Sequence, residues 1–155
     1  MKAIGAILET KEDKKCLVLT VSRYFFKGHP IAGAPTDFPL LIIKDEKIHT
    51  IRADEKGYWK KVVDKVNSGK YYLSIRTWSG KPYASKQSEV TRVYSMNYQE
   101  IYMSNEGIMV DDRMLTLDEV KTLAANDGLS VENFEGWFRK LPFKGCILHF
   151  TNKVY

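Results

Sequence analysis

The stretch Asp45-Glu46-Lys47-Ile48-His49-Thr50-Ile51-Arg52 is the most polar strand-like segment of the chain. Apolar and polar residues alternate over residues 47–52, which predicts a β-strand. On a regular strand successive side chains point to opposite faces, so Lys47 and Thr50 would lie on opposite sides. They can converge only if a turn or bulge lies near Lys47, and the Asp45-Glu46 pair permits one. The alternative is a solvated edge strand of mixed charge.

The segments on either side of this strand predict an α+β fold. Capping residues and the helical spacing of apolar residues indicate helices over residues 36–43, 58–66, 116–125 and 130–140. Apolar runs and alternation indicate strands over residues 16–22, 47–52, 70–77, 88–95, 99–103 and 145–151. Because helices fall between strands and a strand stands near each end, we predict a curved, largely closed sheet or small barrel.

Length and charge indicate one domain with a surface suited to an anionic partner. The 155 residues, 44% hydrophobic and 28% charged, suit a single globular domain over residues 1–155, and no linker or repeat interrupts them. Residues 1–95 carry 18 Lys or Arg and 10 Asp or Glu, whereas residues 96–155 carry 6 and 9. The net charge of +5 is therefore uneven, which favours a polarised surface.

The sequence also bears on the compartment. No apolar run approaches the roughly 20 residues that span a bilayer, and the apolar start between Met1 and Glu9 is too short for a signal peptide. We therefore expect a cytoplasmic protein with no membrane partner. Cys16 and Cys146 stand in apolar strings without a CxxC motif, which favours reduced, buried thiols over a disulfide or a zinc site.

A second group of polar and aromatic residues, residues 76–87, interleaves three cations with two aromatic side chains. Cations neutralise phosphates, and Trp or Tyr rings stack on unpaired bases. The candidates for nucleic-acid binding are therefore Arg76, Trp78, Lys81, Tyr83, Lys86 and Gln87, together with Arg52 from the polar strand. The alternative is a hairpin whose aromatic residues anchor it to the core.

Other motifs are uninformative or absent. The three histidines match no local metal spacing, and the chain has no P-loop, GxGxxG or GxSxG string, so we predict no metal and no cofactor. Asp127 stands in a helix break, just before a predicted helix start where the helix dipole favours an anion. A purely structural role in the linker is the alternative for Asp127.

These residues resemble the ASCH domains, which are relatives of the PUA RNA-binding fold. The GxKxxTxR signature of that family follows its first helix and stands here as Asp45, Lys47, Thr50 and Arg52, with Asp in place of Gly. The order of strands and helices is similar over roughly residues 16–151. The resemblance implies a PUA-like twisted β-barrel with flanking helices, whose partner is RNA or a nucleoside or nucleotide ligand.

The family includes small bacterial N-acetylcytidine amidohydrolases. In them the signature Lys is the general base, the signature Thr is the nucleophile, and a Glu before the second late helix donates a proton. The resemblance implies these roles for Lys47, Thr50 and Asp127, although Asp is one methylene shorter than Glu. The loop at residues 24–37 and the insertion at residues 79–87 are longer than in those enzymes and would enlarge the cleft.

Three functions follow as hypotheses. The first is a binding module for RNA or a modified nucleotide, which the Asp45 and Asp127 departures and the basic hairpin favour. The second is an amidohydrolase or ribonuclease that uses Lys47 and Thr50. The third is a non-catalytic protein-interaction domain. The sequence does not identify the ligand, the oligomeric state or the pathway.

Overall fold

The computed structural model describes residues 13–155. The segment from Met1 to Glu9, predicted to be too short for a signal peptide, lies outside the described residues. The helices within residues 13–155 are α2 (Phe38–Ile43), α3 (Tyr58–Asn67), α4 (Leu117–Asn126) and α5 (Val131–Trp137). The strands are β1 (Lys15–Thr20), β2 (His49–Arg52), β3 (Tyr71–Trp78), β4 (Gln87–Val93), β5 (Asn97–Ser104), β6 (Gly107–Val110), β7 (Arg113–Met114) and β8 (Phe143–His149). The predicted α+β class is confirmed. None of the four described helices is long and apolar enough to cross a bilayer.

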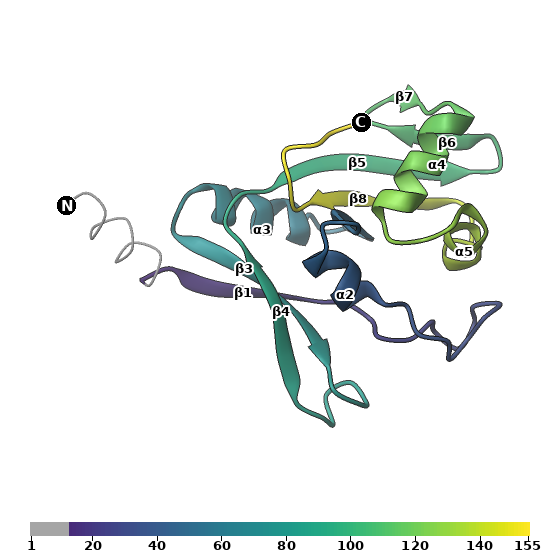
Figure 1. Ribbon diagram of the computed structural model, residues 1–155. Coiled ribbons are helices and arrows are strands. Elements are labelled where there is room, and N and C mark those ends of the chain that lie inside the picture. Colours follow the sequence, from purple (N-terminus) through teal and green to yellow (C-terminus); the bar gives the residue numbers. More distant parts are fainter. Residues whose placement is uncertain (1–12) are drawn as a thin grey trace.

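The strands form two sheets (Figure 1). The first has the order β1-β3-β4, with β1 parallel to β3 and β4 antiparallel to it. The second is antiparallel and has the order β2-β8-β5-β6-β7. Predicted strands 16–22, 70–77 and 88–95 fall in the first sheet, and 47–52 and 145–151 fall in the second. No strand pairing joins the sheets within residues 13–155, so these five segments do not form one sheet, and the closed barrel stays a prediction.

Local sequence signals start the last two helices, α4 and α5, where the sequence predicts. Thr116 forms the predicted capping box at the start of α4, and the Ser130 hydroxyl accepts a hydrogen bond from a backbone N–H in the first turn of α5. Helix α5 ends at Trp137 rather than near Lys140, because Phe138 already leaves the helical conformation. Gly136 also weakens the helix near its end, because glycine loses more conformational freedom on folding than any other residue.

The beginning of the polar strand differs from the sequence prediction. Strand β2 starts at His49, so Lys47 lies in the turn that precedes it. The preceding helix α2 has Asp37 at its N-cap rather than Thr36, although the Thr36 hydroxyl still accepts a hydrogen bond from the Phe38 N–H at 3.2 Å. Strands β6 and β7 were not predicted, because segments of four and two residues are too short to show alternation.

The core lies between the two sheets and brings their edges close to each other. Helix α3 contacts β3 of the first sheet and β5 and β8 of the second. Its buried face is apolar, as are the facing strand residues; the set is Val62, Val63, Val66, Leu73, Ile75, Ile147 and Leu148. At the edge, the Arg52 guanidinium on β2 donates a hydrogen bond to the carbonyl of Thr20 on β1. This contact connects the edge strands of the two sheets.

Gly145 allows β2 to pair closely with β8, so its substitution should be costly. A Cβ at Gly145 would overlap the backbone carbonyl oxygen of Arg52, which is held in the strand pair and cannot move aside cheaply. We expect Gly145→Ala to lower the free energy of unfolding by about 1–3 kcal/mol, as overpacking does. Urea unfolding measures this. The control is Gly80→Ala, whose new methyl group would find its nearest neighbour at 3.5 Å. Equal stabilities of the two variants would contradict the prediction.

Candidate functional site

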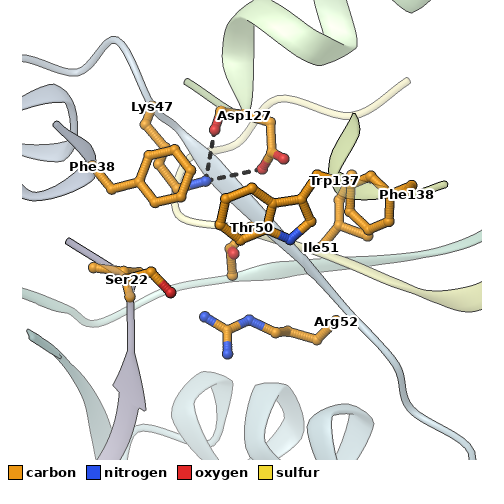
Figure 2. A pocket seen from close by; sticks show the side chains of 10 residues that line it. Ser22, Phe38, Lys47, Thr50, Ile51, Arg52, Asp127, Trp137 and Phe138 are labelled. Atoms are coloured by element: carbon orange, nitrogen blue, oxygen red, sulfur yellow. Dashed lines mark hydrogen bonds and ion pairs between the residues drawn. The ribbon is translucent and has the colours of Figure 1, made fainter. Parts of the chain in front are cut away.

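A cavity of about 150 Å³ lies where the end of β1 approaches β2, and we call it the Lys47 cavity. Its polar lining comes from Ser22, Lys47, Thr50, Arg52 and Asp127. Its apolar lining comes from Val21, Phe38, Ile51, Trp137 and Phe138. Figure 2 shows the Lys47 amine beside the Asp127 carboxylate, with the Phe38 and Trp137 rings close to them. The structure therefore brings together Lys47, Thr50, Arg52 and Asp127, four of the residues selected from the sequence.

The turn before β2 explains how Lys47 and Thr50 share one cavity. Asp45 occupies the left-handed region with a φ of 58°, a conformation that glycine adopts without strain and Asp tolerates. Asp45 stands where the GxKxxTxR pattern has Gly, and it adopts the backbone conformation that a glycine would favour. The Lys47 N–H then donates to the Leu41 carbonyl at 3.0 Å, which closes the turn against α2. Lys47 thus leaves the alternation of the strand, as a turn near it would require.

Lys47 holds the end of a helix that is distant in the sequence. Its Nζ donates to the Asp127 Oδ1 at 3.0 Å and to the Asp127 backbone carbonyl at 2.7 Å, and it lies 4.2 Å from the centre of the Phe38 ring. Asp127 is the C-cap of α4, three residues before Ser130, and not the residue just before a helix start. The dipole at a helix C-terminus disfavours an anion. The Lys47 cation compensates the charge of the Asp127 carboxylate and also binds the Asp127 carbonyl, which no N–H of the described helices reaches.

Both members of this pair have shifted pKa values. Burial lowers the pKa of Lys47, the Arg52 charge lowers it slightly further, and Asp127 opposes both effects without cancelling them. Burial by itself raises the pKa of Asp127, but the Lys47 charge and the contacts with His49 together bring it below its usual value. Asp127 is therefore a carboxylate at neutral pH, and it accepts hydrogen bonds rather than donating a proton.

A buried polar layer lies behind Asp127. His49 Nδ1 lies 3.3 Å from the Asp127 Oδ1, and His49 Nε2 lies 2.7 Å from the hydroxyl of Tyr155. The Asn126 amide donates to the same hydroxyl at 2.9 Å. Sequence reasoning gave His49 no role, because its partners come from the α4 end and from beyond β8. His49 thus contacts the same carboxylate oxygen that Lys47 binds and helps to fix its position.

His149 extends this layer along β8. Its Nε2 lies 2.9 Å from the Gln99 Oε1, whereas its Nδ1 is buried and has no hydrogen-bond partner among the described residues. Burial lowers the pKa of His149 to about 4, with a further contribution from the facing His49. The neutral form, with its proton on Nε2, satisfies this geometry because the unprotonated Nδ1 requires no acceptor.

Thr50 and Arg52 supply the remaining polar groups of the Lys47 cavity. Thr50 as a whole is 6% exposed, but its hydroxyl is open to the cavity and has no hydrogen-bond partner within residues 13–155. The Arg52 guanidinium uses one N–H on the Thr20 carbonyl. Burial lowers the pKa of Arg52, and the Asp127 charge partly opposes this lowering. The guanidinium nevertheless stays charged at neutral pH. An unpartnered hydroxyl and a half-buried cation that line the same cavity create a site for a ligand that accepts hydrogen bonds.

The second group of sequence candidates lies elsewhere. Arg76, Trp78, Lys81, Tyr83, Lys86 and Gln87 belong to the β3–β4 hairpin, which extends below α2 in Figure 1, and none of them lines the Lys47 cavity. The Arg76 guanidinium donates to the side chains of Ser74 at 2.9 Å and Gln87 at 3.2 Å. The ring centres of Trp78 and Tyr83 are 5.1 Å apart, and Tyr83 is 91% exposed. The hairpin is thus a separate surface, and its binding role stays a prediction.

Sequence reasoning missed the aromatic walls of the cavity. Phe38 starts α2, whereas Trp137 and Phe138 end α5, and the Phe38 and Trp137 ring centres are 5.5 Å apart. A signal was available, because Trp137-Phe138-Arg139-Lys140 places aromatic residues beside cations, as residues 76–87 do. A cavity of about 150 Å³ accommodates one six-membered ring. The described residues include no group of three or more His, Cys, Asp or Glu side chains arranged to hold a metal ion.

Comparison of the chain with protein families, with curated proteins and with solved structures finds no significant match in any of the three. The ASCH assignment therefore rests on the signature and the order of the elements, and it stays a prediction.

Removing one partner of the buried Lys47–Asp127 pair should cost far more stability than removing one partner of a surface pair. Removing Lys47 takes the cation away from a buried carboxylate and the donor away from the Asp127 carbonyl, so Lys47→Met should cost about 3–5 kcal/mol in the free energy of unfolding. Lys60→Met breaks an exposed pair with Asp64 and should change stability by less than about 1 kcal/mol. Chemical denaturation of both variants measures the difference. If Lys47→Met is as stable as Lys60→Met, the buried pair does not hold α4.

Acid should destabilise the protein through His149. Its pKa is depressed to about 4 in the folded state, so between pH 4 and pH 6.5 the unfolded chain binds a proton that the folded chain excludes. Stability from neutral His149 is therefore fully present above about pH 6.5 and is lost as the pH falls to about 4, with an expected loss of about 2–3 kcal/mol. His149→Gln keeps a donor for Gln99 but does not titrate. Between pH 6.5 and pH 4 the free energy of unfolding of this variant should therefore fall by about 2–3 kcal/mol less than that of the wild type. If the two proteins lose the same stability over this range, His149 is not the group responsible.

Proposed function

We propose that this chain is an ASCH-like nucleic-acid-binding domain that holds one base of RNA, or of a modified nucleotide, in the Lys47 cavity. The observation that carries the proposal is the Thr50 hydroxyl, which lines the cavity without a hydrogen-bond partner within residues 13–155 and lies beside Arg52 among aromatic walls. A planar ring with hydrogen-bond acceptors on one edge matches this combination of donors and aromatic surfaces.

The chemistry of Lys47 supports base recognition. An ammonium group has three N–H donors, and the contacts with the Asp127 carbonyl and carboxylate use two of them. The third donor, the Thr50 hydroxyl and the Arg52 guanidinium can then meet the carbonyl oxygen and ring nitrogen of a pyrimidine. The Phe38 and Trp137 rings supply faces for stacking, which contributes about 1–3 kcal/mol per base in single-stranded complexes.

The architecture supports a PUA-like interpretation of the fold. The two sheets pack on the shared helix α3, and the Arg52 contact with Thr20 connects their edges. We infer that they form the two halves of an incompletely closed barrel, with the Lys47 cavity at the opening between β1 and β2. Helices α2, α4 and α5 flank this opening and contribute Phe38 and Trp137, with Asp127 at the end of α4.

Amide hydrolysis is the second candidate, and the lowered pKa of Lys47 favours it. A neutral Lys47 amine could take the proton of the Thr50 hydroxyl as its oxygen attacks the acetyl carbonyl of N-acetylcytidine. The resulting Lys47 ammonium could return the proton to the leaving amine of cytidine, and water would then hydrolyse the acetyl-threonine ester. Asp127 is an unsuitable proton donor here, because its pKa lies below the usual value. In this reaction Asp127 orients Lys47.

Titration of cytidine and N-acetylcytidine by calorimetry tests the binding proposal. We expect Thr50→Val, which keeps the shape but removes the hydroxyl, to weaken binding by about 2- to 10-fold, the value of one hydrogen bond. Thr91→Val, a half-buried position on β4, is the matched control and should leave the affinity unchanged. No binding of either nucleoside or of a single-stranded RNA containing them would overturn the proposal.

The release of cytidine from N-acetylcytidine separates the enzyme from the binder. If the wild type turns over, Thr50→Ser should retain activity and Thr50→Val should lose it, because only the former keeps a nucleophilic oxygen. Binding of the nucleoside without any release of cytidine would remove the amidohydrolase and leave the binding module.

A further inference from the structure

A second cavity, of about 510 Å³, adjoins the Lys47 cavity and shares four of its wall residues. The shared residues are Ile51, Arg52, Trp137 and Phe138. We call the second space the Arg139 cavity, because Arg139 and the neighbouring Lys140 lie in its wall and not in that of the Lys47 cavity. Its volume falls in the range of about 300–1,000 Å³ that ligand sites usually have. The two cavities therefore lie against the same four side chains.

The composition of the Arg139 cavity indicates what it binds. Its lining contains three cations, Arg52, Arg139 and Lys140, and no carboxylate. It also contains four aromatic rings, Phe26, Trp137, Phe138 and Phe143. Guanidinium and ammonium groups bind phosphate, and aromatic faces stack on unpaired bases. The combination fits a phosphate attached to a planar ring and disfavours a cationic or purely apolar ligand.

The wall that carries Phe26 is held in place by its contacts with α5. The His29 Nε2 lies 2.9 Å from the Asn133 carbonyl, and the Phe26 ring centre is 5.2 Å from that of Trp137. Gly136 makes this contact possible, because a Cβ there would lie 2.7 Å from the His29 Nε2. The loop at residues 24–37, which was expected to enlarge the cleft, thus contributes a packed wall to the second cavity.

We propose that the Arg139 cavity binds the phosphate and the flanking base of the nucleotide next to the one in the Lys47 cavity. The ligand of the site is then an oligonucleotide rather than a free nucleoside. This inference rests on the proposed function, because it continues the same nucleic-acid strand from the first cavity. Arg52 stands between the two positions and contacts the phosphodiester that links them.

The affinities of four probes test the inference: cytidine, cytidine 5′-monophosphate, and the ribodinucleotides CpA and ApC, which place the flanking base on either side. Wild-type protein should bind at least one dinucleotide about tenfold or more tightly than cytidine. The Arg139→Ala/Lys140→Ala variant should lose most of that gain and keep its affinity for cytidine. Lys61→Ala/Lys144→Ala removes the same charge from exposed positions outside both cavities and should bind all probes as the wild type does. Phe26→Ala should weaken the dinucleotide but not the monophosphate.

The outcomes separate this inference from the proposed function. If cytidine binds and the dinucleotides bind no more tightly, or if the Arg139/Lys140 variant weakens every probe equally, the second cavity is not a nucleotide site. If the monophosphate binds as tightly as both dinucleotides, the cavity takes no flanking base, and that part of the inference is overturned. If the dinucleotides depend on Arg139 and Lys140 but are indifferent to Thr50→Val, the strand does not continue from the Lys47 cavity. In that case the proposed function fails as well.

Discussion

The buried ion pair between Lys47 and Asp127 is the interaction on which the rest of the site depends. It connects the turn after α2 to the end of α4, two places that are 80 residues apart in the chain. Taking a lysine and a carboxylate out of water is costly, and the cost is offset here because the same ammonium group also binds the backbone carbonyl of Asp127, the C-cap of α4. Gly128 follows directly, with a φ of 81° and little space for a side chain beside Lys47 and Phe38, so glycine suits the turn towards α5. The position of the α5 aromatic residues over the cavity follows from that turn.

The same pair restricts the chemistry of the cavity. Asp127 is held as a carboxylate by Lys47 and His49, so it accepts hydrogen bonds and orients the lysine. What the site can do then depends on the proton of Lys47. A charged Lys47 presents its third N–H to a ligand and favours binding, whereas a neutral Lys47 can activate Thr50. Burial and Arg52 favour the neutral form, and Asp127 favours the charged one. Base binding and amide hydrolysis are therefore two uses of one arrangement, separated by a single protonation equilibrium.

The polar layer behind the pair connects the site to the core of the five-stranded sheet. His49 and His149 face each other as register partners on β2 and β8. Gln99 on β5, two residues beyond the register partner of His149, contacts the His149 ring at 2.9 Å. Tyr155 joins these strands to the end of α4 through its hydroxyl, which contacts both His49 and Asn126. Buried polar groups are costly unless they are satisfied, and in this layer all the side-chain atoms except the His149 Nδ1 are. The layer accordingly gives the carboxylate of Asp127 a fixed position relative to the sheet.

Local signals in the sequence determined most of the secondary structure, because caps, turns and short-range periodicity act within a few residues. The capping box at Thr116, the Ser130 cap and the strand that ends in Arg52 could all be predicted in this way, and so could a turn that lets Lys47 and Thr50 share a side. The sequence did not determine that Asp127 ends α4, that Phe38 and Trp137 form the walls, or that the residue 76–87 hairpin lies apart from the Lys47 cavity. It also did not show that the strands divide into two sheets. These features depend on contacts between residues far apart in the chain, and only packing around α3 and the buried Lys47–Asp127 pair decided them.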